Sequence, residues 1–313
     1  MSGGITTTII IPTYNGAHKV VNALQSLVGQ SCPPDEILVV IDGSTDDTKS
    51  IIEERKFDLT QLRIIEQKNE GRAGVRNRGA REALKELLIF MDDDMVVPED
   101  WVKFHQQHHL KFPGSFVSGR LDQMHTDGPL TEFGKFENWQ NGRWNKDIRN
   151  SELGEIQLSN PYITANNFSV MKQDFIDMGM FDARLKDAED YDLAVRARLK
   201  NKSIFLSNQC WAWHNDFSAK TFTSYLKRLR EYSNAQWELI RLKPELYGNP
   251  QINERYPSVP SGLKRSFFKL FVNRFMINSM DNHFWTFLPV NLRCKLYDFI
   301  LTANGNYFPT VKI

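Results

Sequence analysis

Short apolar runs alternate with amphipathic stretches through the first hundred residues. Runs rich in Ile, Leu and Val, typical of short buried strands, lie at 7–11, 37–41, 62–66 and 87–91. Apolar residues at helical spacing predict three intervening helices, at 20–28, from the GSTDDT segment to about 55, and at 76–86. Strands and helices in this order form a parallel sheet with right-handed crossovers. We therefore predict an α/β fold, whose ligands bind outside the carboxyl ends of the strands.

The pattern becomes less regular after this first part. Pro98 favours the start of another helix, because proline suits the first helical position. Periodicity then fades between 113 and 160, where Gly, Asn and aromatic residues are common. It returns as a predicted helix at 190–200, and two extended segments follow, at 204–206 and 210–214.

The last third of the chain has a different pattern from the first two. From about residue 220 it carries long amphipathic helical stretches without strands, broken near Pro244 and Pro257. We therefore predict two domains, an α/β domain at 1–217 and a helical extension at 218–313.

The charge balance argues against nucleic acid as a partner. The chain of 313 residues has 39 Lys and Arg against 38 Asp and Glu, a formal net charge of +1. A chain without excess positive charge has no general attraction for a polyanion, so any such binding would require a local site.

The cysteines and the N-terminal segment predict a compartment. Cys32, Cys210 and Cys294 are odd in number and far apart, which argues against a disulfide framework and favours a reducing environment. The segment MSGGITTTII lacks the pattern of a secretory signal, and no apolar run approaches the roughly 20 residues that span a bilayer. We expect a cytoplasmic protein.

Three consecutive acids follow the fourth predicted strand. Asp92, Asp93 and Asp94 would repel one another at the end of a buried strand, by roughly 1–4 kcal/mol per close pair. A hard divalent cation relieves this repulsion, and magnesium or manganese characteristically bridges carboxylates to substrate phosphates. The alternative is an acidic turn before a helix.

Two loops at the ends of the first two strands are candidates for holding a nucleoside. PTYNG at 12–16 presents the aromatic Tyr14, and IDGSTDD at 41–47 presents Asp42, whose carboxylate can accept a hydrogen bond from a pyrimidine imide. The alternative is a pair of ordinary turns, because Asn-Gly and Asp-Gly are common turn dipeptides.

A second acidic pair and a histidine lie later in the chain. Glu189 and Asp190 precede a predicted helix, whose dipole would lower the pKa of a carboxyl and keep it ionised as a general base. Helix capping is the alternative role. His214 ends the extended segment CWAWH, where it would complete a metal site or serve only the fold.

Three further histidines are spaced for one helix face. His105, His108 and His109 have i, i+3, i+4 spacing, which permits zinc binding, but no acid or cysteine at matching spacing accompanies them. We expect a solvated helix face.

In order along the chain, these segments resemble the family-2 glycosyltransferases, which have the GT-A fold. The resemblance covers about 5–215 and rests on IIIPTYNGAHKVVNALQSLVGQ, ILVVIDGSTDDT, NEGRAGVRNRGARE, IFMDDDMVVPEDW, TANNFSVMKQDFIDMGMFDARLKDAEDYDLAVRA and WAWH. It implies a Rossmann-like sheet flanked by helices, with a nucleotide-sugar half at about 1–100 and an acceptor half at about 101–217. Ile41 departs from the family, which commonly has a second acid before Asp42.

The resemblance also implies a role for each candidate residue. The catalytic base would be Asp190, with Glu189 beside it, and the metal ligands would be Asp94 and His214. The donor would be bound by Pro12, Thr13, Tyr14, Asn15, Asp42, Arg76, Asp92 and Asp93. Asn166 and Asn167 fall in the acceptor segment. Because Asp93 is also acidic, the register of the Asp-x-Asp motif is open by one residue.

The implied reaction is an inverting sugar transfer. A donor nucleotide-diphospho-sugar, most often a UDP-sugar in this family, would bind with Mn²⁺ or Mg²⁺, and Asp190 would deprotonate an acceptor hydroxyl. The acceptor would be a glycan, a lipid-linked glycan, a peptide or a small molecule. Two other functions are an inactive sugar-nucleotide or carbohydrate-binding module, which would be expected to lose these acids, and a nucleotidyltransferase, which would require a basic Gly-rich loop after the first strand.

Two aromatic-rich segments leave their roles open. FENWQNGRWN at 136–145 sets Trp139 and Trp144 among polar residues, which suits sugar rings or an ordinary loop. SYLKRLREY and LKRSFFKLFVNRF, in the extension, mix basic and aromatic residues. Such helices fit peripheral contact at the inner face of a membrane, core packing or a homodimer interface.

Overall fold

The computed structural model describes residues 4–55, 57–59, 61–123, 131–144, 155–157, 162–215, 221–247 and 261–309. These residues form two compact units. The first contains the described residues up to 123 and those between 155 and 215, and the second contains helix α5 (Glu132–Trp144) with those from 221 onward. Each unit has its own hydrophobic core.

The first unit is built on one sheet. Its described strands are β1 (Thr7–Thr13), β2 (Glu36–Asp42), β3 (Leu62–Gln67), β4 (Leu87–Met91), β5 (Met95–Val96), β6 (Phe116–Gln123), β7 (Glu155–Gln157), β8 (Asn167–Met171) and β9 (Ile204–His214). They are ordered β3-β2-β1-β4-β8-β6-β9-β5, and β7 pairs with β9. The four strands predicted from the sequence pair in parallel, which confirms that part of the fold.

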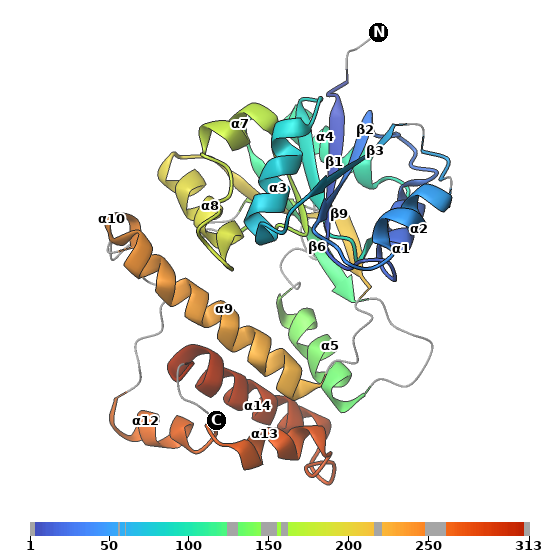
Figure 1. Cartoon of the computed structure of the whole chain (residues 1–313). Coiled ribbons are helices and arrows are strands. Elements are labelled where there is room, and N and C mark those ends of the chain that lie inside the picture. The colour runs from blue at the N-terminus through green and yellow to red at the C-terminus, as the bar shows by residue number, and fades with distance from the viewer. Residues whose placement is uncertain are drawn as a thin grey trace. The chain divides into compact units, whose positions relative to one another are not determined.

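Helices cover both faces of the parallel strands (Figure 1). They are α1 (Val20–Leu27), α2 (Thr48–Glu54), α3 (Gly71–Glu82), α4 (Trp101–Lys111), α7 (Lys172–Asp177) and α8 (Glu189–Leu199). Alternate residues of β1 face opposite sides, with Ile9 and Ile11 in the core beneath α1 and Ile10 in the core beneath α3. A Cβ at Gly79 of α3 would lie 2.4 Å from Ile10 Cγ2, so this glycine lets the helix approach the strand closely.

The second half of the sheet is mixed. Strand β8 runs antiparallel to both β4 and β6, whereas β6 and β9 are parallel. The two extended segments predicted at 204–206 and 210–214 are one strand, β9, whose end pairs with the short strand β5. This pairing returns the chain to the end of β4, so residues from 91 to 96 and from 213 to 215 share one edge of the sheet.

The second unit is helical. Its described helices, besides α5, are α9 (Phe222–Leu242), α10 (Pro244–Tyr247), α12 (Gly262–Lys269), α13 (Arg274–Asp281) and α14 (Val290–Leu301), with a π-helix at Thr302–Tyr307. The expectation of long amphipathic helices holds best for α9, which has 21 residues and begins with a capping box at Thr221 and Ser224. None of the described helices combines the length and the apolar character needed to cross a membrane.

The segment 136–145 differs from its prediction. It was placed in the α/β domain without regular structure, whereas its described residues, 136–144, lie in α5, which groups with the C-terminal helices. Phe136 is fully buried in the core of the helical unit, where its ring stacks on Tyr297 at 4.9 Å. Phe136 is therefore a core residue of the second unit, and Trp139 packs against the same core.

Candidate active site

The three aspartates lie where β4 ends and are fixed on both sides by backbone hydrogen bonds. The Asp92 N–H donates to the Asn166 carbonyl at 3.2 Å, and the Asp94 carbonyl accepts from the Asn215 N–H at 2.8 Å. These bonds join the acids to the segment before β8 and to the end of β9, two parts of the chain that are distant in sequence.

The aspartates do not share one environment. The side chains of Asp92 and Asp94 are 29% and 22% exposed, whereas that of Asp93 is 9% exposed and turns inward. There Asp93 accepts a hydrogen bond from Thr13 Oγ1 at 2.6 Å and faces Lys19 Nζ at 3.4 Å. Burial raises the pKa of Asp93 to about 6 against these stabilising contacts.

Asp94 and His214 face each other across the β5–β9 pair. Met95 is in register with His214, which brings His214 Nε2 to 3.4 Å from Asp94 Oδ2. The other carboxylate oxygen, Asp94 Oδ1, is buried and has no hydrogen-bond partner. Among the described residues, no group of three or more His, Cys, Asp and Glu forms a ready-made metal cage. A divalent cation fits a carboxylate with one unpaired oxygen beside a histidine, and its other ligands would be water and substrate phosphate.

Arg76 joins the two acidic segments. Its Nη2 contacts Asp92 Oδ1 at 2.5 Å, and its Nη1 contacts Glu189 Oε1 at 3.3 Å. The guanidinium is buried, and although burial alone would lower its pKa, the charges of Asp92 and Glu189 raise it. The Arg76 Nε has no partner. The acids after β4 and the acids that begin α8 therefore lie next to each other, joined by one arginine.

Asp190 is the second residue of α8, and its carboxyl accepts a hydrogen bond from the Tyr191 N–H at 2.7 Å. The residue before the pair, Ala188, has a left-handed backbone with φ 60°. The expected lowering of the pKa by the helix dipole is not found. Burial and the neighbouring charge of Glu189 raise the pKa of Asp190 to about 7, because they outweigh the backbone hydrogen bonds from Tyr191 and Ala165 and the charge of Arg76.

The loops after β1 and β2 are tied to each other. Asn15, with φ 48°, accepts a hydrogen bond on Oδ1 from the Thr45 N–H at 2.8 Å, and its own N–H donates to Ser44 Oγ at 3.0 Å. Pro12 and Thr13 end β1, and the Tyr14 side chain is exposed. This places the predicted donor residues of the first strand beside those of the second.

Asp42 is more constrained than the sequence predicted. Its buried carboxylate accepts hydrogen bonds from Gln67 Nε2 at 2.7 Å and from the N–H groups of Glu70 and Gly71 at 2.9 and 3.0 Å. It therefore caps the start of α3, a role that the sequence pattern did not reveal. Oδ2 makes one of these bonds and Oδ1 two, so a carboxylate with about four acceptor positions keeps one for a ligand.

The two predicted acceptor asparagines, Asn166 and Asn167, have different environments. Asn166 lies next to the aspartates with its Oδ1 buried and unpartnered. Asn167 is fully buried: its Oδ1 accepts from Trp101 Nε1 at 3.2 Å, and its Nδ2 donates to the Cys210 carbonyl at 2.8 Å. Asn167 thus joins α4, β8 and β9 and is not available to an acceptor, which corrects its assignment.

The two predicted acceptor tryptophans lie in the helical unit. Trp139 lines a cavity of about 260 Å³ with Tyr225 and Asp298, and Arg143 lies 4.7 Å from its ring. Trp144 is the last residue of α5, and its side chain is outside the described part of the structure.

The histidines of α4 were expected on a solvated face, and this was wrong. His105 and His109 are buried and share Ser169, whose Oγ lies 2.8 Å from His105 Nδ1 and from His109 Nε2. His108 Nε2 lies 3.0 Å from Ser115 Oγ. Burial lowers the pKa of His105 to about 3 and that of His109 well below its usual value, so both are neutral.

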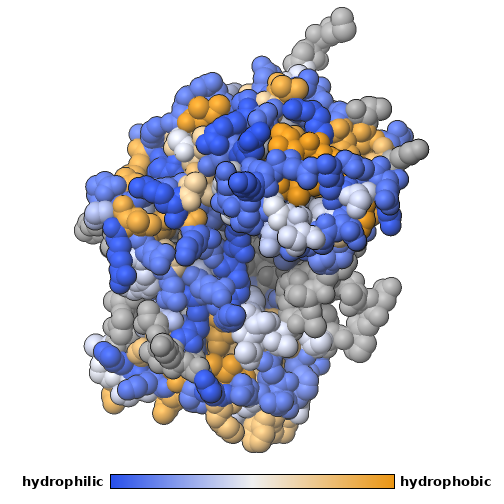
Figure 2. Space-filling view, in the orientation of Figure 1, coloured by the Kyte–Doolittle hydropathy of each residue, from blue (hydrophilic) through white to orange (hydrophobic). Residues whose placement is uncertain are grey.

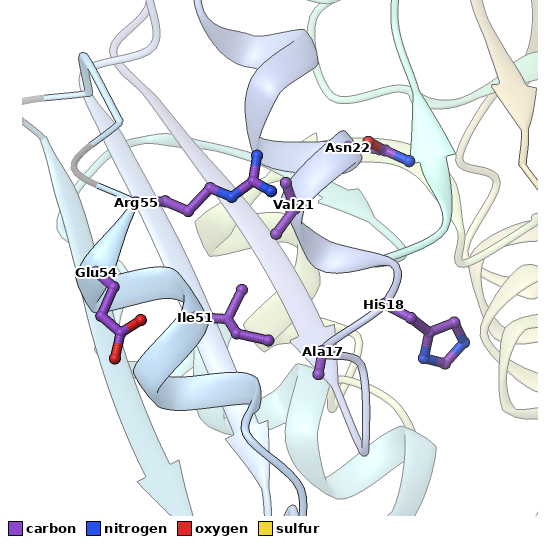
Figure 3. Close-up of a pocket in the computed structure, with 7 residues that line it drawn as sticks. All are labelled: Ala17, His18, Val21, Asn22, Ile51, Glu54 and Arg55. Atoms are coloured by element: carbon purple, nitrogen blue, oxygen red, sulfur yellow. The ribbon is translucent and has the colours of Figure 1, made fainter.

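A separate hollow of about 330 Å³ lies beside α1 and α2 (Figure 3). Its lining comes from the residues before α1, from α1 and from α2, and Arg55 extends from the end of α2 toward Val21. None of the predicted site residues lines it.

Lys19 is a partner of Asp93 that the sequence pattern did not indicate. It is the first cation after β1, and the pairing depends on Gly16, where a Cβ would lie 2.4 Å from Asp93 Oδ2. The Asn-Gly dipeptide was the available signal, since glycine permits this close approach.

The model of glycosyl transferase family 2 matches residues 8–175, which are 168 of the 313 residues. The chain belongs to this family. Among curated relatives, the uncharacterized glycosyltransferase YfnE of Bacillus subtilis is 27% identical over 232 residues, covering 60% of this chain and 59% of YfnE. The glycosyltransferase AglE of Haloferax volcanii is 25% identical over 242 residues, covering 75% of each.

Solved structures agree with this family-2 assignment at the level of the fold. A mannosyltransferase from Pyrobaculum calidifontis in complex with GDP-Man and Mn²⁺ aligns with a TM-score of 0.62 and 16% identity, over 97% of this chain and 88% of that one. S. aureus TarS 1-349 in complex with UDP-GlcNAc aligns with a TM-score of 0.54 and 18% identity, over 98% and 90%. The fold is the GT-A fold expected from the sequence.

Proposed function

We propose that this glycosyltransferase moves a sugar from a nucleotide diphosphate, with UDP as the first candidate, onto an acceptor hydroxyl with inversion. The observation that carries the proposal is Arg76, which joins Asp92 after β4 to Glu189 at the start of α8. An inverting transfer requires a site for the diphosphate and a separate base, and this arginine links the segments that would supply them. The GDP-Man and UDP-GlcNAc bound to the similar structures are consistent with a nucleotide-sugar donor.

Asp94 and His214 are the proposed ligands of a divalent cation, Mn²⁺ or Mg²⁺. Support comes from their 3.4 Å separation and from the unpartnered Asp94 Oδ1. When bound, the cation would offset charge on the departing diphosphate. Asp92, held by Arg76, would accept hydrogen bonds from the ribose or the donor sugar.

Asp190 is the proposed general base. With its pKa raised to about 7, a substantial fraction of the carboxyl is ionised at neutral pH, and the proton that it takes is held more tightly than by an ordinary aspartate. Glu189 would act through Asp190, because its charge contributes to the raised pKa. The loop residues Pro12, Thr13, Tyr14 and Asn15 would hold the nucleoside with the remaining acceptor position of Asp42.

On the acceptor side we propose Asn166, whose buried Oδ1 has no partner beside the aspartates. Trp139, in its own cavity of the helical unit, is proposed as a stacking surface for a sugar ring. The proposed acceptor is a carbohydrate hydroxyl.

Donor binding is tested by thermal unfolding with nucleotide diphosphates and their sugars, with and without Mn²⁺. A ligand that binds only the native chain stabilises it by RT ln(1 + [L]/Kd), so the donor should raise Tm most in the presence of metal. The Asp94→Ala variant should lose the part of this rise in Tm that depends on the metal. A metal-dependent shift equal to wild type in Asp94→Ala would rule out this metal ligand.

Transfer is tested with Asp190→Asn in the same donor conditions. Removing a general base typically costs about 10²–10⁴-fold in rate, while donor binding should persist. Asp177→Asn, on the exposed end of α7, is the matched control. Near-normal turnover by Asp190→Asn would refute the base, and a wild-type chain that binds donor without transfer or hydrolysis would favour the inactive binding module.

A further inference from the structure

Helix α12 and the residue that caps its C-terminus, Leu270, carry an apolar stripe that faces solvent. Leu263, Phe267 and Leu270 are spaced i, i+4 and i+7 and are all exposed, with Leu263 at 90% and Leu270 at 67%. The opposite side is anchored, because Phe268 packs with Ala303 and Phe308 in a small core of its own. The helix is therefore held to the helical unit by one side, while its apolar stripe stays exposed on the other.

A second group of exposed aromatic residues follows. Phe275 of α13 lies 6.2 Å from the ring of Phe284, which lies 6.4 Å from that of Phe287, and all three are more than half exposed. We call these six residues, Leu263 to Phe287, the exposed apolar surface. Figure 2 shows apolar residues along the lower rim of the helical unit, where Figure 1 places α12 and α13.

This concentration is unusual within the chain. Of the seventeen exposed large apolar side chains among the described residues, nine lie between Leu263 and Phe299. Exposed apolar residues scattered singly require no partner, but a concentrated group indicates a surface that is covered in use.

The charges beside the surface indicate what covers it. Residues 261–309 contain six Lys and Arg, namely Lys264, Arg265, Lys269, Arg274, Arg293 and Lys295, against two acids, Asp281 and Asp298. On α12 three basic residues flank the apolar stripe without any acid, and all three are exposed. The whole chain has a net charge of only +1, so this positive charge is local.

We propose that the exposed apolar surface binds an anionic membrane surface, with α12 lying in the plane of the interface. Leucine and phenylalanine would enter the boundary between headgroups and acyl chains, and Lys264, Arg265 and Lys269 would contact anionic headgroups. A second copy of the chain fits less well, because a two-fold contact would bring the basic flanks of both copies together. The proposal goes beyond sugar transfer and does not depend on it.

Vesicle co-sedimentation of the full chain tests the proposal without donor or acceptor. The probes are vesicles of phosphatidylcholine alone and of phosphatidylcholine with phosphatidylglycerol. We expect binding to the anionic vesicles, reduced by salt. Each basic residue near an anionic surface is worth about fivefold in partitioning, so Lys264→Glu with Arg265→Glu and Lys269→Glu should weaken binding by more than about tenfold.

A second variant tests the apolar contribution. Leu263→Ser with Phe267→Ser and Leu270→Ser should also weaken binding by more than about tenfold. The matched control is Leu84→Ser with Leu110→Ser, which changes exposed leucines of the sheet unit and should bind as wild type does. Unchanged denaturation midpoints would show that the variants are folded.

Three results would overturn the proposal. The first is the absence of vesicle binding by the wild type, or equal binding to neutral and anionic vesicles. The second is wild-type binding by both triple variants. The third is a concentration-dependent dimer in sedimentation velocity that the serine variant abolishes, which would make a second copy the occupant.

Discussion

The sheet unit and the helical unit depart from ordinary burial in opposite directions. In the sheet unit the exceptions are buried charges: Asp93, Arg76 and Glu189 are nearly inaccessible, and each has an oppositely charged partner. In the helical unit the exceptions are exposed apolar groups, such as Leu263 and Phe287. Buried charge is costly unless it is paired, so it marks the place where a polar ligand is handled. Exposed apolar area marks contact with a larger partner.

The largest expected effect tests the buried charges. Arg76→Met would leave Asp92 and Glu189 without their shared cation, and we expect a loss of about 3–5 kcal/mol in the free energy of unfolding. Chemical denaturation of the full chain measures it. The control is Arg78→Met, two residues after Arg76 in the sequence. It removes only an exposed i,i+4 ion pair with Glu82 and should cost less than about 0.5 kcal/mol. If both variants lost the same free energy of unfolding, the buried ion pairs of Arg76 would be no more important to stability than an exposed pair.

Two neighbouring asparagines separate support of the fold from contact with substrate. Asn167→Leu removes the hydrogen bond to the Cys210 carbonyl and leaves the buried Trp101 Nε1 without its acceptor, which should cost about 1–3 kcal/mol while donor affinity remains. Asn166→Ala should change stability by less than about 0.5 kcal/mol and reduce transfer. Chemical denaturation and transfer assays on both variants measure these effects. If Asn166→Ala lost stability and Asn167→Leu lost only transfer, the roles of the two asparagines would be reversed.

The pH dependence of transfer tests the pair at the start of α8. In its proposed role as the base, Asp190 must be ionised, so with a pKa of about 7 we expect kcat/KM to fall about tenfold per pH unit below that value. Glu189→Gln removes a like charge, lowers the pKa of Asp190 and should move this limb to lower pH. If the acidic limb of the pH profile did not move in Glu189→Gln, the charge of Glu189 would not be a cause of the raised pKa of Asp190.

The same raised pKa has a consequence for stability. The folded value exceeds the ordinary value of about 3.9, so the native chain binds this proton more tightly than the unfolded chain does. The stabilising contribution is complete below about pH 4 and is lost as pH rises to about 7. The free energy of unfolding of the metal-free chain, measured between about pH 4 and pH 7, tests this contribution. The Asp190→Asn variant is the control, because it lacks the titrating carboxyl.

The smallest effect tests the exposed apolar surface. Leu263→Ser alone should change the free energy of unfolding by less than about 0.5 kcal/mol, because a side chain 90% exposed has little packing to lose. A larger loss would mean that Leu263 serves the fold of the helical unit.

The parallel half of the sheet was predictable because its strands are short continuous apolar runs, a local signal. The order of motifs also predicted that acids would gather at the strand ends. Helix α5 was missed because its apolar positions, including Phe133, Phe136 and Trp139, are separated by helix-weakening Gly and Asn, and packing in another unit stabilises it.

The local environments were not predictable because they depend on partners far along the chain. The burial of His105 and His109 depends on Ser169, some 60 residues away. The pKa of Asp190 rises through burial in the folded site, whereas the sequence showed only a helix terminus. Asp42 looked like a ligand for a base, and its bonds to Glu70 and Gly71 appear only when α3 is packed beside β2.

Ala188 determines how α8 begins. A left-handed φ of 60° costs an alanine roughly 1–2 kcal/mol, and glycine would adopt it without that cost. Glycine at this position would also widen the range of directions in which the helix leaves the loop, and with it the position of the adjacent carboxylates. The methyl group of a single alanine would thus restrict the direction of the proposed base, Asp190, at a cost of roughly 1–2 kcal/mol in folding free energy.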